Sequence, residues 1–478
     1  MPIKIALVAN PRITLNPESS SSRQACPEAI YLLRRLVEYL GIREDVDLLC
    51  IIGELLAPAE EPQPALTALK AILDKASFPV LMAPAHGTAG AELCLEIFGK
   101  EMFRDLNGFR VQACDFPPEK ELSLDSLQAA LDAAASPSPA ARKRVVILPT
   151  GIRPTTHPGA FSPDVLSAHN IAAIVTARSP AMADEPNLAG IEALDDFSAT
   201  PYSFALLSLA DGDQAPTRQD ITLRLPLPLR DLHTHSHFAY CNDDLDLAWE
   251  SRLMDAVNLS GTAITEHSGH LVFSQKEYWG KLWYSGTLPQ SPQHNRKAAY
   301  RDFLARAAKQ DQRFQPGLEI DIDLTGRIIA DKDLLEATRF RIGAVHFLSM
   351  PKPAPDTPGA VEEFMRLTER LITSGLIQAL AHPFRVFSWD GAGEKPTRVF
   401  NRIVKMLKKH NIAAEINFHH NRPDPVFTRK CLDAGVKISL GSDAHSLYEL
   451  GAFLPHLHFL REIGYDGDWR DILINAEP

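Results

Sequence analysis

The sequence predicts two α/β domains in tandem, the second built on a parallel sheet or barrel. Short apolar segments alternate with amphipathic segments of helical period along most of the chain. Buried strands that alternate with helices imply βαβ units, whose strands run parallel. The 478 residues are enough for two or three domains with full cores. A break near residues 211–228, where DGDQAPTRQD precedes ITLRLPLPLR, divides a domain of residues 1–225 from a domain of residues 229–478.

Composition narrows the class of protein. Hydrophobic residues make up 45% and charged residues 23% of the chain, as in ordinary globular proteins. The net charge of −11 makes a broad nucleic-acid-binding face unlikely. The six cysteines form no CxxC pair, which suits a reducing compartment. The N-terminal MPIKIALVAN is too short for a signal peptide or a membrane span, so we expect a cytoplasmic protein without a membrane partner.

The first domain shows the alternation expected of an α/β fold. The predicted helices are EAIYLLRRLVEYLG (28–41) and PALTALKAILDKA (64–76). SFALLSLADGD (203–213) reads as one arm of a hairpin, and AAASPSPAARKR (133–144) as an exposed loop. The predicted strands are IKIALVAN (3–10), VDLLCIIGELL (46–56), FPVLMAPAHG (78–87), RVVILPTG (144–151) and NIAAIVTA (170–177).

In the second domain, nearly every apolar segment ends in a side chain that can bind a metal. In RDLHTHSHFAYCNDD, His233 and His235 are two residues apart and therefore point to the same side of a strand. The later segments GTAITEH, PGLEIDI, RIGAVHF, IQALAHP and VKISLGSDAH end near Glu266, His267, Glu319, His346, His382, Asp443 and His445. Because the carboxyl ends of barrel strands meet at one mouth, we expect these residues to converge. Imidazoles with a few carboxylates suit zinc, manganese or iron.

At these residues the sequence resembles the polymerase and histidinol phosphatase (PHP) family of metal-dependent phosphoesterases, over residues 229–460. The resemblance implies a distorted (β/α)7 barrel with two to three divalent transition metal ions. It implies three sets of ligands: His233, His235, Glu319 and Asp443 for the first ion; Glu319, His346 and His382 for the second; His267 and His445 for the third.

Two positions depart from the family pattern. Glu266 stands where the family has Asp, and it either orients His267 or reaches elsewhere. Tyr240 and Cys241 stand where an Asp or His completes the third site. A thiolate binds zinc or iron well, so Cys241 is either a ligand or a small buried residue. Asp243 and Asp244 are fallback ligands or helix caps.

Other polar residues of the second domain are candidates for substrate contact or support. Arg385, just after AHP, is expected to grip a phosphate, and with Glu266 it is a predicted catalytic residue. Glu415 and Asn417 end their own strand and suit second-layer or substrate contacts. The aromatic segment 270–290 is either a lid or simple packing. The histidines without support from the pattern, expected on the surface or behind the ligands, are His237, His270, His419 and His420.

The first domain resembles calcineurin-like metallophosphoesterases less specifically, in its strand–helix rhythm and in a few positions. Asn10, Arg12 and Glu54 stand where that family keeps metal ligands, His86 lies within Ala85–Gly87, and Thr150, Gly151 and residues 177–180 also lack the expected histidines. The resemblance implies a degenerate sandwich domain without its metals, which packs against the barrel, regulates it or forms a homo-oligomer. Otherwise it is an α/β domain of unknown role.

The sequence as a whole predicts a hydrolase in which a metal-bridged hydroxide attacks a phosphate ester, most simply a small phosphomonoester. There is no GxSxG motif and no P-loop, so no side-chain nucleophile is indicated. Two alternatives stay open. One is a phosphodiesterase or nuclease that acts on nucleotides or nucleic acid; the other is a non-catalytic metal-bound interaction protein.

Overall fold

The computed structural model describes residues 2–15, 27–58, 60–99, 101–114, 127, 129, 143–149, 166, 171–177, 191–194, 197, 202–210, 216–280, 283–286 and 295–476. The chain forms two compact units, residues 1–224 and residues 225–478. No helix among the described residues has the length and apolar character needed to cross a membrane.

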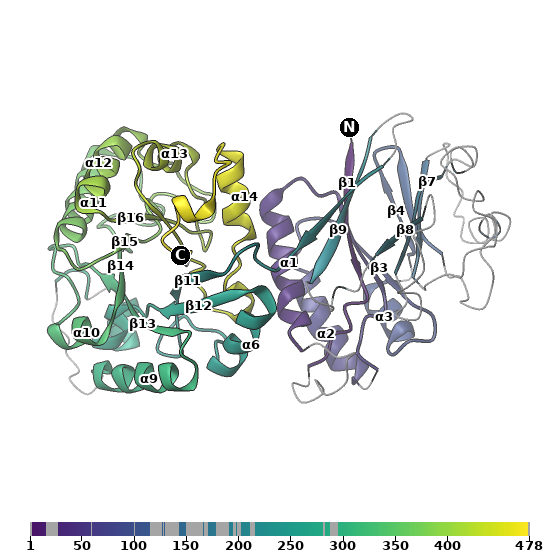
Figure 1. Ribbon diagram of the computed structural model, residues 1–478, viewed down its shortest axis with the longest axis horizontal. Helices are drawn as coiled ribbons and strands as arrows, with labels where there is room; N and C mark the ends of the chain where they lie inside the picture. Colours follow the sequence, from purple (N-terminus) through teal and green to yellow (C-terminus); the bar gives the residue numbers. More distant parts are fainter. Residues whose placement is uncertain are drawn as a thin grey trace. The chain divides into compact units, whose positions relative to one another are not determined.

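The first unit contains two five-stranded sheets (Figure 1). One sheet has the order β10-β9-β1-β2-β3, with β1, β2 and β3 parallel and β9 and β10 forming an antiparallel hairpin. Its strands are β1 (Ile3–Ala9), β2 (Leu48–Gly53), β3 (Val80–Pro84), β9 (Ser203–Leu209) and β10 (Thr217–Thr222). The other has the order β4-β5-β6-β7-β8, with β5 to β8 parallel. Its strands are β4 (Phe103–Leu106), β5 (Phe109–Ala113), β6 (Lys143–Leu148), β7 (Ile171–Ala177) and β8 (Ile191–Leu194).

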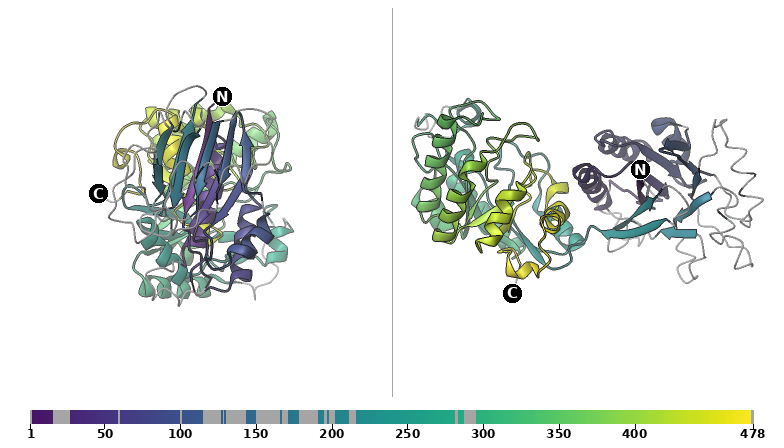
Figure 2. Two further views of the ribbon diagram at one scale, coloured as in Figure 1. Left: turned by 90° about the vertical axis from the view of Figure 1, so that its right-hand side faces the viewer. Right: turned by 90° about the horizontal axis from the view of Figure 1, so that it is seen from above.

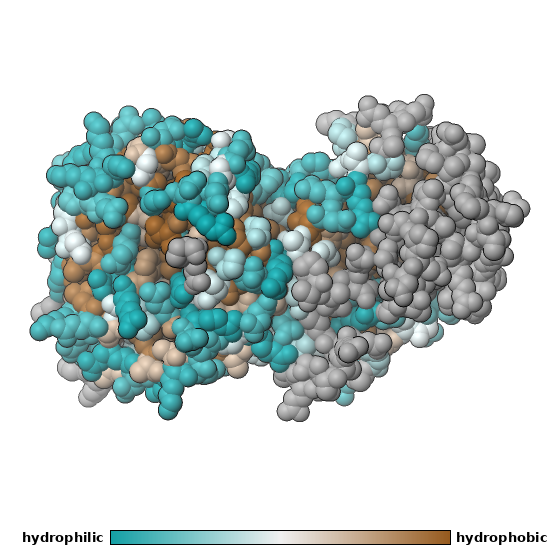
Figure 3. All heavy atoms as spheres, viewed as in Figure 1, coloured by the Kyte–Doolittle hydropathy of each residue, from teal (hydrophilic) through white to brown (hydrophobic). Residues whose placement is uncertain are grey.

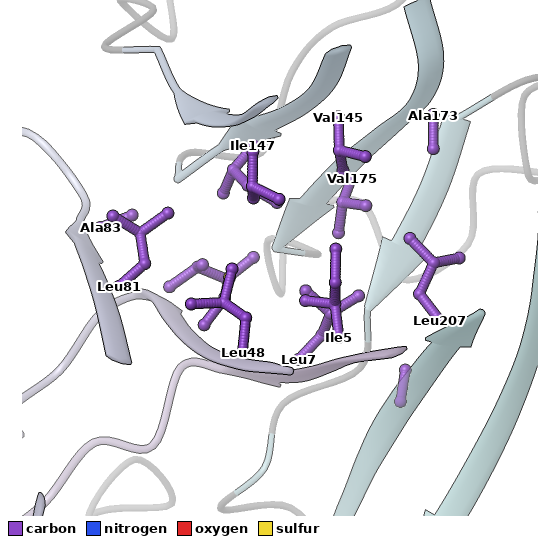
Figure 4. Packing of buried hydrophobic residues seen from close by; sticks show 14 of the residues in the cluster. Ile5, Leu7, Leu48, Leu81, Ala83, Val145, Ile147, Ala173, Val175 and Leu207 are labelled. Atoms are coloured by element: carbon purple, nitrogen blue, oxygen red, sulfur yellow. The ribbon is translucent and has the colours of Figure 1, made fainter. Parts of the chain in front are cut away.

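The core of this unit lies between its two sheets (Figure 4). Alternate residues of β1, such as Ile5 and Leu7, meet alternate residues of β6 and β7, such as Ile147 and Val175. Successive side chains of a strand point to opposite faces of the sheet, so every second residue faces the other sheet. Helices α1 (Ala29–Arg43), α2 (Pro62–Leu73) and α3 (Ala91–Phe98) lie on the other side of the first sheet (Figure 1). The expected α/β sandwich and its hairpin are therefore confirmed.

Two sequence predictions in this unit fall partly outside the described residues. Most of the predicted loop 133–144 lies outside them, and its last two residues, Lys143 and Arg144, instead begin β6. Thr150, Gly151 and residues 178–180, where the absence of metal ligands was noted, also lie outside.

The second unit is a seven-stranded parallel barrel in the sequential order β11 to β17 (Figures 1 and 2). Its strands are β11 (Leu229–Thr234), β12 (Leu259–Ile264), β13 (Phe314–Asp321), β14 (Phe340–Ala344), β15 (Ala379–Leu380), β16 (Ala413–Ile416) and β17 (Ile438–Leu440). β11 meets the segment after β17 through one parallel bridge, Thr234 to Ala444. The C-terminal segment completes the closure, since Leu473 pairs with Ile438 and Ala476 with Leu229. The predicted distorted (β/α)7 barrel is confirmed.

Helices connect the strands and surround the barrel (Figure 2). They are α6 (Leu247–Val257), α7 (Ser268–Val272), α8 (Gln275–Trp279), α9 (Lys297–Gln310), α10 (Lys332–Ala337), α11 (Pro358–Thr373), α12 (Phe400–His410), α13 (Pro425–Asp433) and α14 (Leu454–Glu462). The Asp246 carboxylate caps α6 by accepting from the backbone N–H groups of Ala248 and Trp249. Asp243 and Asp244, the predicted caps, instead accept from the Ser446 hydroxyl and the Leu447 backbone N–H.

Candidate metal centre

The carboxyl ends of the barrel strands bring the predicted ligands together. His233 lies in β11 and His235 directly follows it, and the segments after β12, β14, β15 and β17 supply most of the others. All of these side chains except Cys241 are buried: His233, His235, Glu266, His267, Glu319, His346, His382, Asp443 and His445. Residues more than two hundred positions apart in the sequence thus share one enclosed polar cluster.

Glu319 is the centre of this cluster. Its Oε1 lies 3.0 Å from His382 Nε2 and 3.2 Å from His346 Nε2. The same oxygen lies 3.6 Å from His233 Nε2, and the other oxygen lies 2.6 Å from His267 Nδ1. One carboxylate therefore faces four imidazoles from four different segments, which is the arrangement needed to bridge neighbouring cations.

Asp443 is a second carboxylate of the cluster and contacts the two histidines at the end of β11. Its Oδ1 lies 2.9 Å from His235 Nε2 and 3.3 Å from His233 Nε2. Asp443 and His382 both have positive φ angles, 56° and 28°. Such backbone conformations are costly for residues other than glycine, and they concentrate at functional sites.

Several buried atoms of the cluster make no hydrogen bond among the described residues. They are His233 Nε2, His267 Nδ1, Glu319 Oε2 and His346 Nε2. These atoms lie close to one another but not in the geometry of hydrogen bonds. Burying a polar atom without a hydrogen-bond partner costs free energy, which a bound cation would offset. Triads whose ligand atoms lie within 4.8 Å of one another include His233–His235–Glu319, Glu319–His346–His382 and His235–His267–His445. This donor set fits divalent transition metals.

Carboxylates behind the cluster hold the imidazoles in place. His233 Nδ1 lies 2.8 Å from Glu415 Oε1, and His346 Nδ1 lies 2.7 Å from Asp321 Oδ1. Each bond directs the opposite ring nitrogen, Nε2, at Glu319. The sequence analysis anticipated Glu415 but missed Asp321. The available signal was its spacing, because Asp321 stands two residues after Glu319 and so points to the same side of β13.

The glycine of GSDAH makes room for one of these supports. A Cβ atom on Gly441 would lie 2.0 Å from Glu415 Oε1 and 2.7 Å from the Cβ of His233. Any side chain at this position would displace the carboxylate that holds His233. The glycine therefore belongs to the motif for a steric reason.

Glu266 lies behind His235 rather than behind the His267 ring. Its Oε1 is 3.4 Å from His235 Nδ1, and its Oε2 accepts from the backbone and hydroxyl of Ser236. It reaches His267 only through the backbone N–H, at 3.0 Å. These contacts make Glu266 a positioning residue for His235.

The charges of the cluster favour a bound cation. Burial alone would raise the pKa of Glu319, but His346, His267 and His233 lower it well below its usual value. Burial and the nearby Arg385 lower the pKa of His382 well below its usual value. For His233, His235 and His346, burial lowers the pKa, but the neighbouring carboxylates raise it overall, so these rings favour the protonated form. Because metals bind ionised carboxylates and neutral imidazoles, a bound cation would have to replace these protons.

Cys241 lies at the edge of the cluster. Its Sγ is 3.8 Å from His267 Nε2, and the two residues form a further potential metal-binding triad with His270. His270 is fully buried, so the expected surface position is wrong for it and the position behind the ligands is the correct alternative. His419 stacks on His445 with ring centroids 4.6 Å apart, whereas His237 is exposed.

Arg385 is buried and points into the cluster. Its Nη1 donates to Asp443 Oδ2 at 2.5 Å, and its Nη2 donates to His382 Nε2 at 2.8 Å. Trp389 lies beside it, with the guanidinium carbon 5.7 Å from the ring centroid. Trp389 also stacks on His420, and Lys352 Nζ lies 4.4 Å from the Trp389 ring centroid. These residues form a cationic and aromatic wall next to the ligands.

Several aromatic residues of the segment 270–290 are packed into the unit, whereas Trp279 is 48% exposed. Phe273, Tyr278 and Trp283 are buried in one hydrophobic cluster with Ile329. This favours packing over a lid for these residues. Residues 281, 282 and 287–290 of the segment lie outside the described residues.

In the first unit, the residues at the positions where the calcineurin-like family keeps metal ligands contact one another instead. Asn10 and Arg12 follow β1 and have positive φ angles of 46° and 42°. Arg12 Nε pairs with Glu54 Oε2 at 2.7 Å, and Asn10 Oδ1 accepts from the Glu54 backbone N–H. A fixed guanidinium thus lies where the weaker resemblance would have placed a metal.

Comparison with known proteins yields short matches to phosphatases. No family model matches the chain. A probable phosphatase of Proteus mirabilis (strain HI4320) is 31% identical over 115 residues, which are 22% of this chain and 42% of that protein. Probable phosphatases of Enterobacter sp. (strain 638) and Pectobacterium carotovorum subsp. carotovorum (strain PC1) are 26% identical over 33% and 34% of this chain and 58% and 60% of their own lengths. The chain therefore matches about half the length of these relatives.

Among solved structures, the crystal structure of a dimetal phosphatase from Danio rerio is similar at 13% identity. The match covers 45% of this chain and 98% of that one, with a TM-score of 0.28. A TM-score this low carries no inference about fold or function.

Proposed function

We propose that the chain is a metal-dependent phosphoesterase whose barrel is of the PHP type and whose substrate is a small phosphate monoester. The observation that carries the proposal is the contact of one buried carboxylate, Glu319, with imidazoles from four segments of the barrel. The relatives named probable phosphatases support the same class of reaction.

The residues divide into three ligand groups in this proposal. His233, His235, Glu319 and Asp443 hold one ion, and Glu319, His346 and His382 hold another. His267, His445 and Cys241 hold the third. When bound, such ions lower the pKa of water and polarise the phosphoryl group, so no side-chain nucleophile is needed.

The chain's own residues supply the rest of the chemistry. Arg385 provides fixed positive charge and two parallel N–H groups for the oxygens of the phosphoryl group. Its present contacts to Asp443 and His382 keep it within reach of that group. Lys352 and Trp389, beside Arg385, are placed to contact the part of the substrate that leaves.

The test combines elemental analysis with a phosphate-release assay. Purified full-length protein should carry two to three equivalents of zinc, manganese or iron. It should hydrolyse p-nitrophenyl phosphate faster than bis(p-nitrophenyl) phosphate, and chelation should abolish the activity until metal is restored. Full activity after chelation would overturn the proposal. Faster hydrolysis of the diester would instead assign a phosphodiesterase.

A further inference from the structure

A cavity lies at the opposite end of the barrel from the metal cluster. Its volume is about 540 Å³, within the range of small-molecule sites. Most strand residues that line it stand at or near the starts of their strands: Arg230 of β11, Gln315 of β13, Phe340 of β14 and Ala413 of β16. Leu232 lines it from the middle of β11. The metal ligands lie at or beyond the ends of strands, so the two sites share strands without sharing residues.

The interior of the barrel is lined largely by small residues, of which Ala413 lines the cavity. Five of the eight buried residues in the interior cluster are alanines: Ala263, Ala344, Ala379, Ala381 and Ala413. Barrels of this general type usually fill their interior with Val, Ile and Leu. Figure 3 shows hydrophobic residues on the face of the barrel unit that is turned to the viewer, within a hydrophilic surround.

The lining combines an apolar floor with amides and cations. Leu232 and Phe340 are buried, and Gln315 and Gln378 are half-buried above them. The Gln378 Oε1 accepts from the backbone N–H of Arg341, which fixes the direction of its amide. The floor is therefore apolar, with polar groups placed around it.

Three cations surround the cavity: Arg230, Lys408 and Lys437. None of the lining residues, all of which the structure describes, is acidic, although the chain carries a net charge of −11. Lys408 and Lys437 are held at the rim by backbone carbonyls of Gly435 and Asp471. Arg230 lies against Gly261, where a Cβ would stand 3.0 Å from its Nη1, so the glycine makes room for the guanidinium. The charge of the site thus selects anions.

We propose that this cavity binds a small organic anion with an apolar body, at a site separate from the metal centre. The apolar body occupies the floor at Leu232 and Phe340, and the anionic group meets Arg230 and the rim lysines. The ligand of this cavity is not the substrate, because the metal ligands lie at or beyond the ends of the strands. β11, for example, carries Leu232 of this floor and His233 of the cluster in succession.

The test uses 1-anilinonaphthalene-8-sulfonate, an anion with an apolar ring system, in a fluorescence titration of the full-length protein. One saturable site is expected. Arg230→Gln and, separately, the rim change Lys437→Gln should weaken binding about 10-fold, as for loss of a charged contact. Saturating inorganic phosphate should leave the Kd unchanged within about 2-fold.

Matched controls are Arg366→Gln and Arg402→Gln. These residues line a different groove, on α11 and α12, which also contains Glu362 and Glu369. The controls should bind the probe as the unchanged protein does, and thermal denaturation should verify that each variant is folded. Lys437 is exposed, so its replacement keeps the test valid if Arg230→Gln does not fold. An unchanged Kd in Lys437→Gln and every folded Arg230→Gln sample, or displacement of the probe by phosphate, would overturn the proposal.

Discussion

The two units place polar side chains after their parallel strands in different ways. In the sandwich, the carboxylate of Glu54 is paired with the guanidinium of Arg12. In the barrel, the carboxylate of Glu319 faces four imidazoles. A guanidinium is always charged and repels a cation, whereas a neutral imidazole binds one. Arg385 also pairs with Asp443 in the barrel cluster, so the contrast concerns the two central carboxylates. Glu54 is closed by a guanidinium, whereas Glu319 is faced by imidazoles that can bind a cation once they are neutral.

Loss of the central carboxylate should have the largest effect. Glu319→Gln keeps the shape but removes the charge that faces His233, His267, His346 and His382. We expect loss of bound metal and a fall in kcat/KM of at least about 100-fold, since even outer supports of metal sites are worth about 10–100-fold. Elemental analysis and steady-state kinetics measure both.

The matched change in the sandwich is Arg12→Gln, which breaks the ion pair with Glu54. It should leave the metal content and kcat/KM within about 2-fold of the unchanged protein, because an ion pair with one partly exposed member contributes little. Equal losses in both variants would contradict the contrast between the two units.

Arg385→Gln tests whether the cationic residue inside the barrel cluster serves the substrate rather than the fold. We expect kcat/KM to fall by about 10²–10³ while the metal content stays the same, because a preorganised charge is lost from the phosphoryl oxygens. Arg402→Gln, on the surface of α12, is the control. A loss of metal in Arg385→Gln would mean that this arginine supports the ligands instead.

Asp321→Asn should have a smaller effect, through His346. The amide cannot hold the imidazole as the carboxylate does, so metal affinity should fall about 10–100-fold. Titration of metal against a competing chelator measures this affinity, with Asp333→Asn on α10 as an exposed control. An affinity equal to that of the control would show that Asp321 does not position His346.

The smallest effect on activity is expected at Glu250, which concerns the pH dependence of stability instead. Burial, with Asp246 and Asp231 nearby, raises the pKa of Glu250 to about 8. The folded protein keeps this proton up to that pH, whereas the unfolded chain releases it near pH 4.5. The stability contributed by this group is therefore lost as pH rises from about 4.5 to 8, by up to about 1.4 kcal/mol per pH unit. The free energy of unfolding of Glu250→Gln, relative to that of the unchanged protein, should be higher at pH 8 than at pH 5. Denaturant unfolding at both pH values measures this difference. A difference that does not vary with pH would contradict this assignment.

The sequence predicted the barrel and the convergence of its strand ends because both follow from local patterns. Apolar segments that end in His, Glu or Asp identify the residues at the mouth, whatever their separation along the chain. The supports were harder to predict. The orientation of His270 depends on packing. The spacing of Asp321 from Glu319 places both side chains on one side of β13, but an Asp has several other uses, as the cap formed by Asp246 shows.

The cavity at the other end of the barrel had no signal in the sequence. Its lining comes from several strands and from the end of α12. Arg230 and Leu232 stand beside the His-x-His motif, but no pattern in the sequence indicates that they meet the other lining residues. It arises from the small size of interior residues such as Ala379 and Ala413, which only the assembled barrel brings together.

The most direct test of the account is anomalous X-ray diffraction from crystals of the metal-loaded protein at the absorption edges of zinc, manganese and iron. The account predicts anomalous peaks within the barrel cluster, beside Glu319, and none beside Arg12 and Glu54. Metal-loaded crystals without a peak at Glu319, or with a peak at Arg12 and Glu54, would contradict it.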